Sequence, residues 1–315
     1  MLLIRLDAIG DALALAPALA SLRRHAIPFD LVLTTRNADI FARATARQTI
    51  VADFALRSNE PENRAAIDRL GARLREHRYT HVIVATEDPG GYRLASVAGA
   101  PERIGFADPW TKPFKAIWTR RILTQPIYRS ARLRGNEHES ETLFRLVASL
   151  TGDAAPSRDA RELRPLVLDA EPLPDARIAV QLTDKWARLD IARDDVDALL
   201  RALQNAGPLR IIAARKEAPY AQPIAQTAGL HVDYFDGMDD WKAAVAAARV
   251  LVAPDSGAIH LAGTLGTPVV AVFPPQHAFD AQVARWAPWA SPQRIVRAGE
   301  SWPQFAAQAT AELLA

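Results

Sequence analysis

The sequence contains no cysteine and no long run of apolar residues. The absence of cysteine excludes disulfide bonds and thiolate metal sites, and it is typical of a protein from a reducing compartment. No stretch approaches the ~18 uncharged apolar residues that a membrane-spanning helix needs. Arg5, Asp7 and Asp11 interrupt the apolar start of the chain, so we predict that it belongs to the folded structure and is not a signal peptide.

Several motifs of known chemistry are also missing. The chain has neither G-x-G-x-x-G nor G-x-x-x-x-G-K, so dinucleotide oxidoreduction and P-loop chemistry have no support. The seven histidines are not spaced like metal ligands. The acidic pairs Asp194-Asp195 and Asp239-Asp240 are predicted to start helices, not to form the Asp-x-Asp loop of metal-dependent sugar transferases. We therefore predict no metal site and no cofactor.

The charge of the chain is small but unevenly distributed. The net charge is +2, yet residues 1–150 hold 22 Lys and Arg against 16 Asp and Glu, whereas residues 151–315 hold 16 against 20. A basic half suits an anionic ligand or a membrane surface, although a solvated arginine-rich surface explains it equally. The arginines are scattered and not interleaved with aromatics, so no nucleic-acid partner is predicted.

Strand and helix patterns alternate along the whole chain, which predicts parallel, doubly wound α/β sheets. Residues 156–176 are rich in proline and are predicted to link an N-terminal domain, residues 1–155, to a C-terminal domain, residues 177–315. Pro17 lies inside the helix predicted from Asp11 to His25, where it either kinks the helix or restarts it. The other N-terminal elements predicted are strands at Leu2–Leu6, Phe29–Leu33, Ile50–Phe54, His81–Ala85, Arg103–Phe106 and Lys115–Ile122, and helices at Ala38–Ala46, Pro61–His77 and Glu137–Leu150.

The most informative stretch is Arg249–Pro275. Val250–Ala253 and Val269–Phe273 are continuous apolar runs typical of buried parallel strands, and Ala258–Leu265 between them has helical spacing. The helix should begin near Ser256, at the carboxyl end of a strand. Free backbone N–H groups at that point suit a phosphate.

A structural explanation of this stretch stays open. Asp255 or Ser256 can act as an ordinary N-cap, which contributes about 1 kcal/mol. His260 can be a core histidine bonded to a carbonyl.

Two motifs, one in each half, together resemble a known family. Leu3-Ile4-Arg5-Leu6 with Ile9-Gly10-Asp11 and Pro17-Ala18-Leu19 is similar to the N-terminal signature of glycosyltransferase family 9, the ADP-heptose:lipopolysaccharide heptosyltransferases. Asp255-Ser256-Gly257, His260-Leu261-Ala262 and Leu265-Gly266-Thr267-Pro268 with Phe273-Pro274-Pro275 are similar to the C-terminal signature of that family.

The resemblance implies a GT-B architecture, in which two Rossmann-like domains face a central cleft. It implies an inverting transferase that moves heptose from an ADP-sugar donor, ADP-heptose, to an inner-core lipopolysaccharide acceptor. The acceptor is anionic and membrane-embedded, which agrees with a basic N-terminal half. We therefore expect a cytoplasmic protein that can contact the inner face of the inner membrane peripherally.

In the N-terminal half the resemblance assigns the general base to Asp11, and Gly10 beside it is expected to contact the nucleotide sugar. Asp7 is the rival carboxylate, because it stands where the family usually has a small hydroxyl residue. The structural alternative is that Asp11 only caps its helix.

The resemblance assigns the donor site to the C-terminal half. Lys185 would compensate the charge of the leaving diphosphate, although the family's Lys-Arg-Trp-Pro pattern is absent there and Lys185 can also be a surface lysine. Glu217 would accept from the ribose hydroxyls, or it is an exposed residue at a helix start. The further donor contacts expected are Thr183, Met238, Asp255, Ser256, Gly257 and His260.

Two other functions stay open at this point. The chain can be a non-catalytic nucleotide-sugar-binding protein of the same fold, or a sugar-nucleotide epimerase of GT-B shape.

Overall fold

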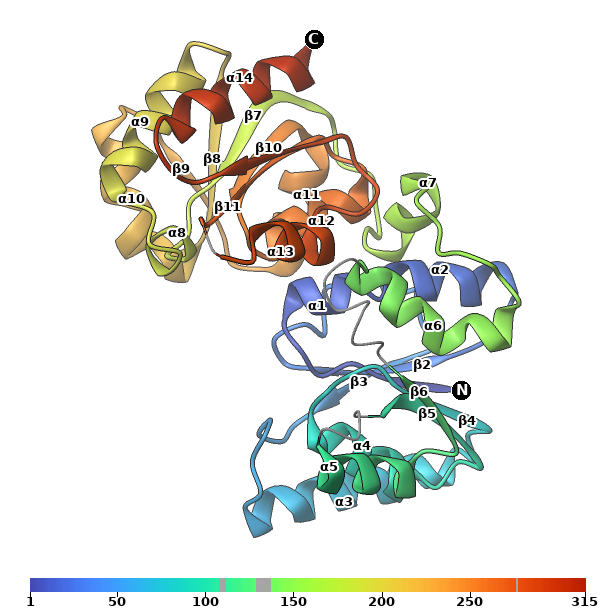
Figure 1. Ribbon diagram of the computed structural model, residues 1–315. Coiled ribbons are helices and arrows are strands. Elements are labelled where there is room, and N and C mark those ends of the chain that lie inside the picture. Colours follow the sequence, from blue (N-terminus) through green and yellow to red (C-terminus); the bar gives the residue numbers. More distant parts are fainter. Residues whose placement is uncertain (108–111, 129–136, 276) are drawn as a thin grey trace. The chain divides into compact units, whose positions relative to one another are not determined.

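The computed structural model describes residues 1–107, 112–128, 137–275 and 277–315. The chain folds into two compact units, Met1–Ser157 and Arg158–Ala315 (Figure 1). Each unit holds one six-stranded parallel sheet with helices on both faces. The predicted fold class of two Rossmann-like, doubly wound domains is confirmed.

The first sheet has the strand order β3-β2-β1-β4-β5-β6. Its centre is β1, whose three residues are fully buried and pair in parallel with both β2 and β4. Helices α1, α2 and α6 cover one face, and α3, α4 and α5 cover the other (Figure 1). The strands are β1 (Leu2–Ile4), β2 (Asp30–Thr34), β3 (Thr49–Ala52), β4 (His81–Val84), β5 (Glu102–Ala107) and β6 (Gln125–Tyr128); the helices are α1 (Ile9–Leu13), α2 (Ala16–Arg24), α3 (Pro61–Glu76), α4 (Pro89–Ala98), α5 (Pro113–Ile122) and α6 (Glu139–Thr151).

The second sheet repeats this order as β12-β11-β10-β7-β8-β9. Its core gathers Val180 and Val252 from the strands with Trp186 and Trp302, whose rings stack at 5.7 Å between centroids. The strands are β7 (Asp175–Gln181), β8 (Leu209–Ala214), β9 (Val232–Phe235), β10 (Ala248–Pro254), β11 (Val269–Phe273) and β12 (Gln293–Arg297); the helices are α7 (Ala160–Leu163), α8 (Lys185–Arg188), α9 (Arg193–Gln204), α10 (Ala218–Thr227), α11 (Met238–Ala247), α12 (Gly257–Leu265), α13 (Phe279–Trp286) and α14 (Trp302–Leu314), with short 3₁₀ helices η2 (Arg164–Leu166) and η3 (Arg215–Glu217).

The strand order creates one topological switch point in each sheet. In the first unit the chain runs outward from β1 to β3 and then returns to β4 on the other side of β1. In the second unit it runs outward from β7 to β9 and returns to β10 on the other side of β7. Open α/β sheets bind ligands at the carboxyl ends of the strands that flank such a point. The loops after β1 and β4, and those after β7 and β10, are therefore the first places to look for a site.

Two of the predicted elements are wrong. Lys115–Ile122 was predicted to be an edge or strand, but it belongs to helix α5, which Pro113 starts. Residues 38–46 form turns and not a helix. There the side chain of Asn37 accepts from the Thr34 amide at 2.8 Å, which stabilises a turn in place of a helical start.

Pro17 acts as a restart, as the sequence allowed. The helix expected from Asp11 to His25 is divided into α1 and α2, and Pro17 lies in the first turn of α2, where a missing N–H costs no hydrogen bond. The sequence did not predict strands β6, β9 and β12 or helices α4 and α13.

The segment predicted as a linker contains structure of its own. Its α7 and η2 belong to the second unit, and Leu163 is fully buried there. Arg164 Nη1 donates to the carbonyl of Leu265 at 2.9 Å. This contact ties the segment to the end of α12.

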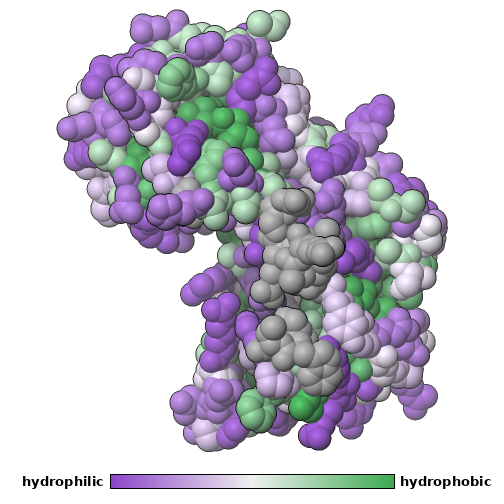
Figure 2. Space-filling model, in the orientation of Figure 1, coloured by the Kyte–Doolittle hydropathy of each residue, from purple (hydrophilic) through white to green (hydrophobic). Residues whose placement is uncertain are grey.

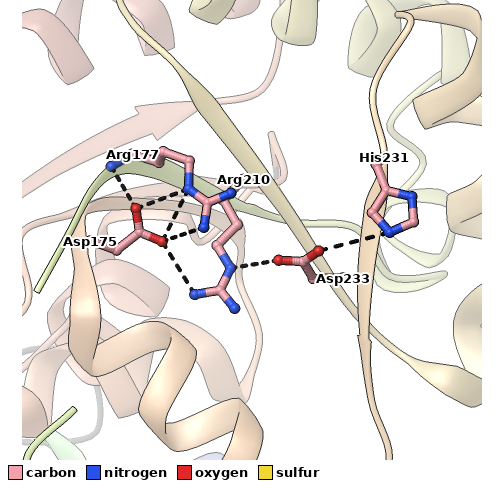
Figure 3. Close-up of polar contacts among 5 residues, drawn as sticks. All are labelled: Asp175, Arg177, Arg210, His231 and Asp233. Carbon is pink, nitrogen blue, oxygen red and sulfur yellow. Dashed lines mark hydrogen bonds and ion pairs between the residues drawn. The ribbon is translucent and has the colours of Figure 1, made fainter. Parts of the chain in front are cut away.

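A cluster of charged residues links the amino ends of β7, β8 and β9 in the second sheet (Figure 3). Asp175 at the start of β7 accepts from Arg177 Nη2 at 2.8 Å and lies 3.3 Å from Arg210 Nη1. Arg210 Nε also contacts Asp233 Oδ2 at 2.8 Å, and His231 Nε2 lies 4.0 Å from the other oxygen of Asp233. The cluster ties β7, β8 and β9 together at the edge opposite to the expected ligand loops. We assign it a structural role.

The face drawn in Figure 2 is mostly hydrophilic, with smaller hydrophobic patches. Among the helices that the structure describes, none is long and apolar enough to cross a membrane.

Candidate active site

The candidate site residues of the first unit are grouped around Arg5, which directly follows β1. Its side chain is 3% exposed, and it donates to the backbone carbonyls of Ala85 and Asp11, the latter at 3.0 Å. These two bonds join the loops after β1 and β4, which flank the switch point of the first sheet. A buried guanidinium requires negative partners, and carboxylates surround this one.

Asp11 is one of these carboxylates. Its Oδ1 lies 3.6 Å from Arg5 Nη2, and its Oδ2 accepts from the amide of Ala8 at 3.2 Å. The second contact means that Asp11 also caps α1, as the structural alternative proposed. Burial is the main cause of a raised pKa at Asp11; Asp7 and Glu139 raise the pKa further, and Arg5 opposes them. A carboxylate with a raised pKa is a stronger base than an ordinary aspartate.

Asp7 lies beside Asp11 but is held differently. Its Oδ2 lies 3.3 Å from Arg5 Nη1, and its backbone carbonyl accepts from the side chain of Asn37 at 2.8 Å. Asn37 is fully buried, so this bond anchors the loop between Arg5 and α1 to the interior of the unit. Asp7 and Asp11 therefore contact different nitrogens of the same guanidinium.

Glu139 completes the group, and no motif of the sequence predicted it. It is the first residue of α6, is 3% exposed at its side chain, and lies 4.0 Å from Arg5 Nη2. No local pattern links it to residues more than a hundred positions earlier in the chain. Arg5 was part of the quoted motif, but its role was not inferred, although a charged residue directly after a buried strand was a usable signal.

In the C-terminal unit the predicted phosphate-binding turn lies at the end of β10. Ser256 is the N-cap of α12, and its Oγ accepts from the Ala258 amide at 3.4 Å. The N-cap role allowed by the sequence is therefore present, through a long hydrogen bond that a stronger acceptor could replace. Gly257 is the first helical residue, and it has no Cβ that would crowd the backbone amides of this turn.

Asp255 and Lys185 come from the two strands that flank the switch point of the second sheet. Burial is the main cause of a raised pKa at Asp255, and this effect is opposed by a hydrogen bond from Gln282 and by the charge of Lys185. Gln282 Nε2 donates to Asp255 Oδ2 at 3.1 Å. Lys185 begins α8, directly after β7, and is partly exposed. Both residues follow the carboxyl ends of the two central strands, β7 and β10, where the sequence predicted them to lie.

Thr183 and Glu217 are both engaged in local contacts. The buried hydroxyl of Thr183 accepts from the amide of Lys185 at 3.3 Å. Glu217 Oε2 accepts from the amide of Asp184 at 2.8 Å, which joins the loop after β8 to the loop after β7. Glu217 is thus more than an exposed residue at a helix start, and one of its carboxylate oxygens is already used.

The remaining predicted residues lie at several places. The ring of His260, in the first turns of α12, meets Trp286 edge-on at 5.6 Å between centroids. Met238 is the first residue of α11, which follows the outermost strand β9, so the structure places it farther from the switch point. Gly10 lies in α1, one residue before Asp11.

The residue groups of the two units offer different chemistry. The N-terminal group offers a buried carboxylate base held by a guanidinium, and the C-terminal loops offer a lysine and a helix N-terminus that suit an anion. In the part of the chain that the structure describes, no group of three or more His, Asp or Glu side chains could hold a metal ion. Asp239 and Asp240 lie in the first turn of α11, and Asp194 and Asp195 in that of α9, as predicted.

Comparison with known proteins agrees with this geometry. Residues 197–314 match the family model described as glycosyltransferase family 9 (heptosyltransferase). The chain carries a glycosyltransferase family 9 domain. The matched range begins in α9 and includes β10, the turn at Ser256 and α12. The family resemblance drawn from the two motifs is therefore confirmed, and with it the prediction of a heptosyltransferase-like glycosyltransferase.

Solved structures extend the likeness in fold to both units. It is similar to a family 9 glycosyltransferase from Veillonella parvula, with a TM-score of 0.76 at 14% identity over 99% of this chain and 96% of the other. Escherichia coli heptosyltransferase WaaC with ADP gives 0.74 at 20% identity, and E. coli ADP-heptose lipopolysaccharide heptosyltransferase II gives 0.71 at 17%, each over 99% of this chain and 98% of the other. At these identities the structures show the fold. No curated protein sequence matches the chain.

Proposed function

We propose that this protein is an inverting glycosyltransferase that transfers heptose from ADP-heptose to an inner-core lipopolysaccharide acceptor. The observation that carries the proposal is Asp11, a carboxylate with a raised pKa at the carboxyl end of the central strand of the first sheet. The family 9 match and the E. coli WaaC structure with ADP support the donor class.

Asp11 acts as the general base. As the acceptor hydroxyl oxygen forms its bond to the anomeric carbon, the O–H proton passes to the carboxylate of Asp11. The bond from that carbon to the diphosphate oxygen breaks at the same time, and its electron pair leaves with ADP. Attack on the face opposite to the leaving group inverts the anomeric configuration.

Lys185 and the start of α12 stabilise the leaving group. Negative charge grows on the diphosphate as its bond to the sugar breaks, so preorganised positive groups lower the barrier more than they strengthen donor binding. Lys185, Ser256 and Gly257 are the residues that we assign to this task. Thr183 binds a phosphate oxygen, and Glu217 accepts from the ribose through its second carboxylate oxygen.

A cationic cavity in the first unit is the candidate acceptor site. It measures about 660 Å³, and Arg57, Arg64 and Arg93 line it beside the aromatic residues Phe114 and Trp118. Arg93 is paired with Asp68 at 2.5 Å, so Arg57 and Arg64 are the arginines assigned to an anionic ligand. Its wall is held by Asp88, which caps α4 through Gly90 and also accepts from the amide of Arg57 at 2.8 Å. A site with several arginines suits the phosphates and carboxylates of an inner-core acceptor.

The test is acceptor-dependent release of ADP. The purified chain is incubated with ADP-heptose in the presence and absence of heptose-free lipopolysaccharide, and free ADP is measured. Release only in the presence of the acceptor supports the transferase. Binding of ADP-heptose without release would indicate a non-catalytic binding protein. Conversion of the donor to another ADP-sugar without acceptor would indicate an epimerase.

A further inference from the structure

Helix α5 presents its large apolar side chains to the outside. Phe114 is 88% exposed, Ile117 is 41% exposed and Trp118 is 36% exposed. Their spacing of three and four residues puts them on one side of the helix. Hydrophobic patches are visible in Figure 2 in the part of the first unit where Figure 1 places α5.

The opposite side of α5 carries small residues. Ala116 and Thr119 are fully buried, and the hydroxyl of Thr119 donates to the carbonyl of Lys115 at 3.0 Å. The fully buried positions of the helix are therefore small residues, while Phe114 is almost wholly exposed and Ile117 and Trp118 are partly exposed, which is unusual for a surface helix. Packing within the chain leaves Phe114 and Ile117 exposed, so their apolar character has no explanation in the fold itself.

The charged residues of the segment that holds this apolar stripe have one sign. Residues 112–128 contain Lys112, Lys115, Arg120 and Arg121 and no aspartate or glutamate. Arg57, Arg64 and Arg93 line the cavity to which Phe114, Lys115 and Trp118 also contribute. The partner of such a surface must accept aromatic side chains and carry negative charge.

We propose that the outward face of α5 docks on an anionic lipid surface. Trp and Phe favour the boundary between headgroups and acyl chains, and Lys and Arg beside them are attracted to anionic headgroups. Trp118 is partly exposed at 36%, and Tyr92 packs against its ring at 5.5 Å between centroids, so only part of the indole can reach a membrane boundary. This surface deepens the proposed function, since it would bring the candidate acceptor cavity to a membrane-embedded substrate.

The experiment measures vesicle binding of the full chain without donor or acceptor. Flotation compares vesicles of phosphatidylglycerol and phosphatidylcholine with vesicles of phosphatidylcholine alone. We expect binding only to the anionic vesicles, and weaker binding at 1 M salt, where the screening length falls to about 3 Å. The double variant F114S/I117S should lower the bound fraction about tenfold, because two interfacial anchors are lost.

A matched control comes from the second unit. Phe305 in α14 is 57% exposed, so F305S removes another exposed phenylalanine and should leave vesicle binding unchanged. The chain has no cysteine, so I117C and F305C each accept a single environment-sensitive fluorophore. Only the label at position 117 should shift to the blue on addition of anionic vesicles.

Several results would overturn the proposal. These are equal binding by wild type and F114S/I117S, equal binding to neutral vesicles, or a dimer that F114S/I117S dissociates while vesicle binding persists. Circular dichroism melting shows that the variants are folded. Failure of vesicle binding with intact ADP release would refute this surface and leave the proposed transferase standing.

Discussion

Arg5 contacts Asp11 at two points: its Nε donates to the Asp11 carbonyl at 3.0 Å, and its Nη2 lies 3.6 Å from Oδ1 of the carboxylate. The same guanidinium contacts Asp7 at 3.3 Å and lies 4.0 Å from Glu139. One buried cation therefore serves three carboxylates. Burial is the main cause of the raised pKa of Asp11, and the excess of negative charge from Asp7 and Glu139 raises this pKa further.

Removal of the Arg5 charge should lower the free energy of unfolding and shift the acid limb of the pH–rate profile. R5M leaves the carboxylates without their buried counter-charge, so the free energy of unfolding should fall by about 3–5 kcal/mol in urea titrations. The pKa of Asp11 should rise further, since Arg5 is the charge that lowers it. In the residual activity, the acid limb of the pH–rate profile should then move to higher pH. R5K is the control and should retain part of both properties, whereas an unchanged acid limb in R5M would contradict this role.

Asp255 should make the protein less stable as pH rises. Its folded pKa is raised, mainly by burial, so the folded state binds the proton more tightly than the unfolded state. The free energy of unfolding therefore falls as pH increases through that folded pKa. D255N should be more stable than wild type at pH 7, and the difference should vanish below the ordinary aspartate pKa of about 3.9.

Thermal melting from pH 3 to pH 8 measures this difference. E300Q changes an exposed carboxylate and should give no comparable trend. A D255N variant that is less stable than wild type at neutral pH would mean that its contacts with Gln282 and Lys185 outweigh the cost of burial.

Lys185 should act on the chemical step more than on donor binding. K185M removes a positive charge from the proposed leaving-group site, so kcat should fall by about 10²–10³, as for loss of one preorganised electrostatic contact. The matched control is K216M, because Lys216 is an exposed lysine in the next loop at the same edge of the sheet. A rise in KM with unchanged kcat would restrict Lys185 to ground-state binding.

The sequence predicted the central strands well, because burial on both faces leaves an unmistakable apolar run. β1, β4, β10 and β11 are of this kind, and so the loops that follow them could be identified as candidate sites. The edge strands β6 and β12 were harder to predict, because β6 has no buried residue and β12 has only Val296, so their sequences carry little pattern.

Tertiary packing decided the elements that the sequence misjudged. The residues of α5 have the composition of a strand, and only their packing through Ala116 and Thr119 makes the helix fit. The roles of Arg5 and Glu139 depend on a contact between residues 134 positions apart, which no local pattern encodes. Candidate site residues in the loops that directly follow a strand were therefore predictable from the sequence. Glu139, which α6 brings to Arg5, was not.

The most direct test of the proposed mechanism compares D11N with D7N in acceptor-dependent ADP release from ADP-heptose. D11N should lower kcat by about 10²–10⁴, the usual contribution of a general base, with the calorimetric Kd for ADP-heptose unchanged. D7N should retain most of the activity, because Asp7 serves mainly as a partner of Arg5. Full activity in D11N together with its loss in D7N would contradict the account and move the base to Asp7.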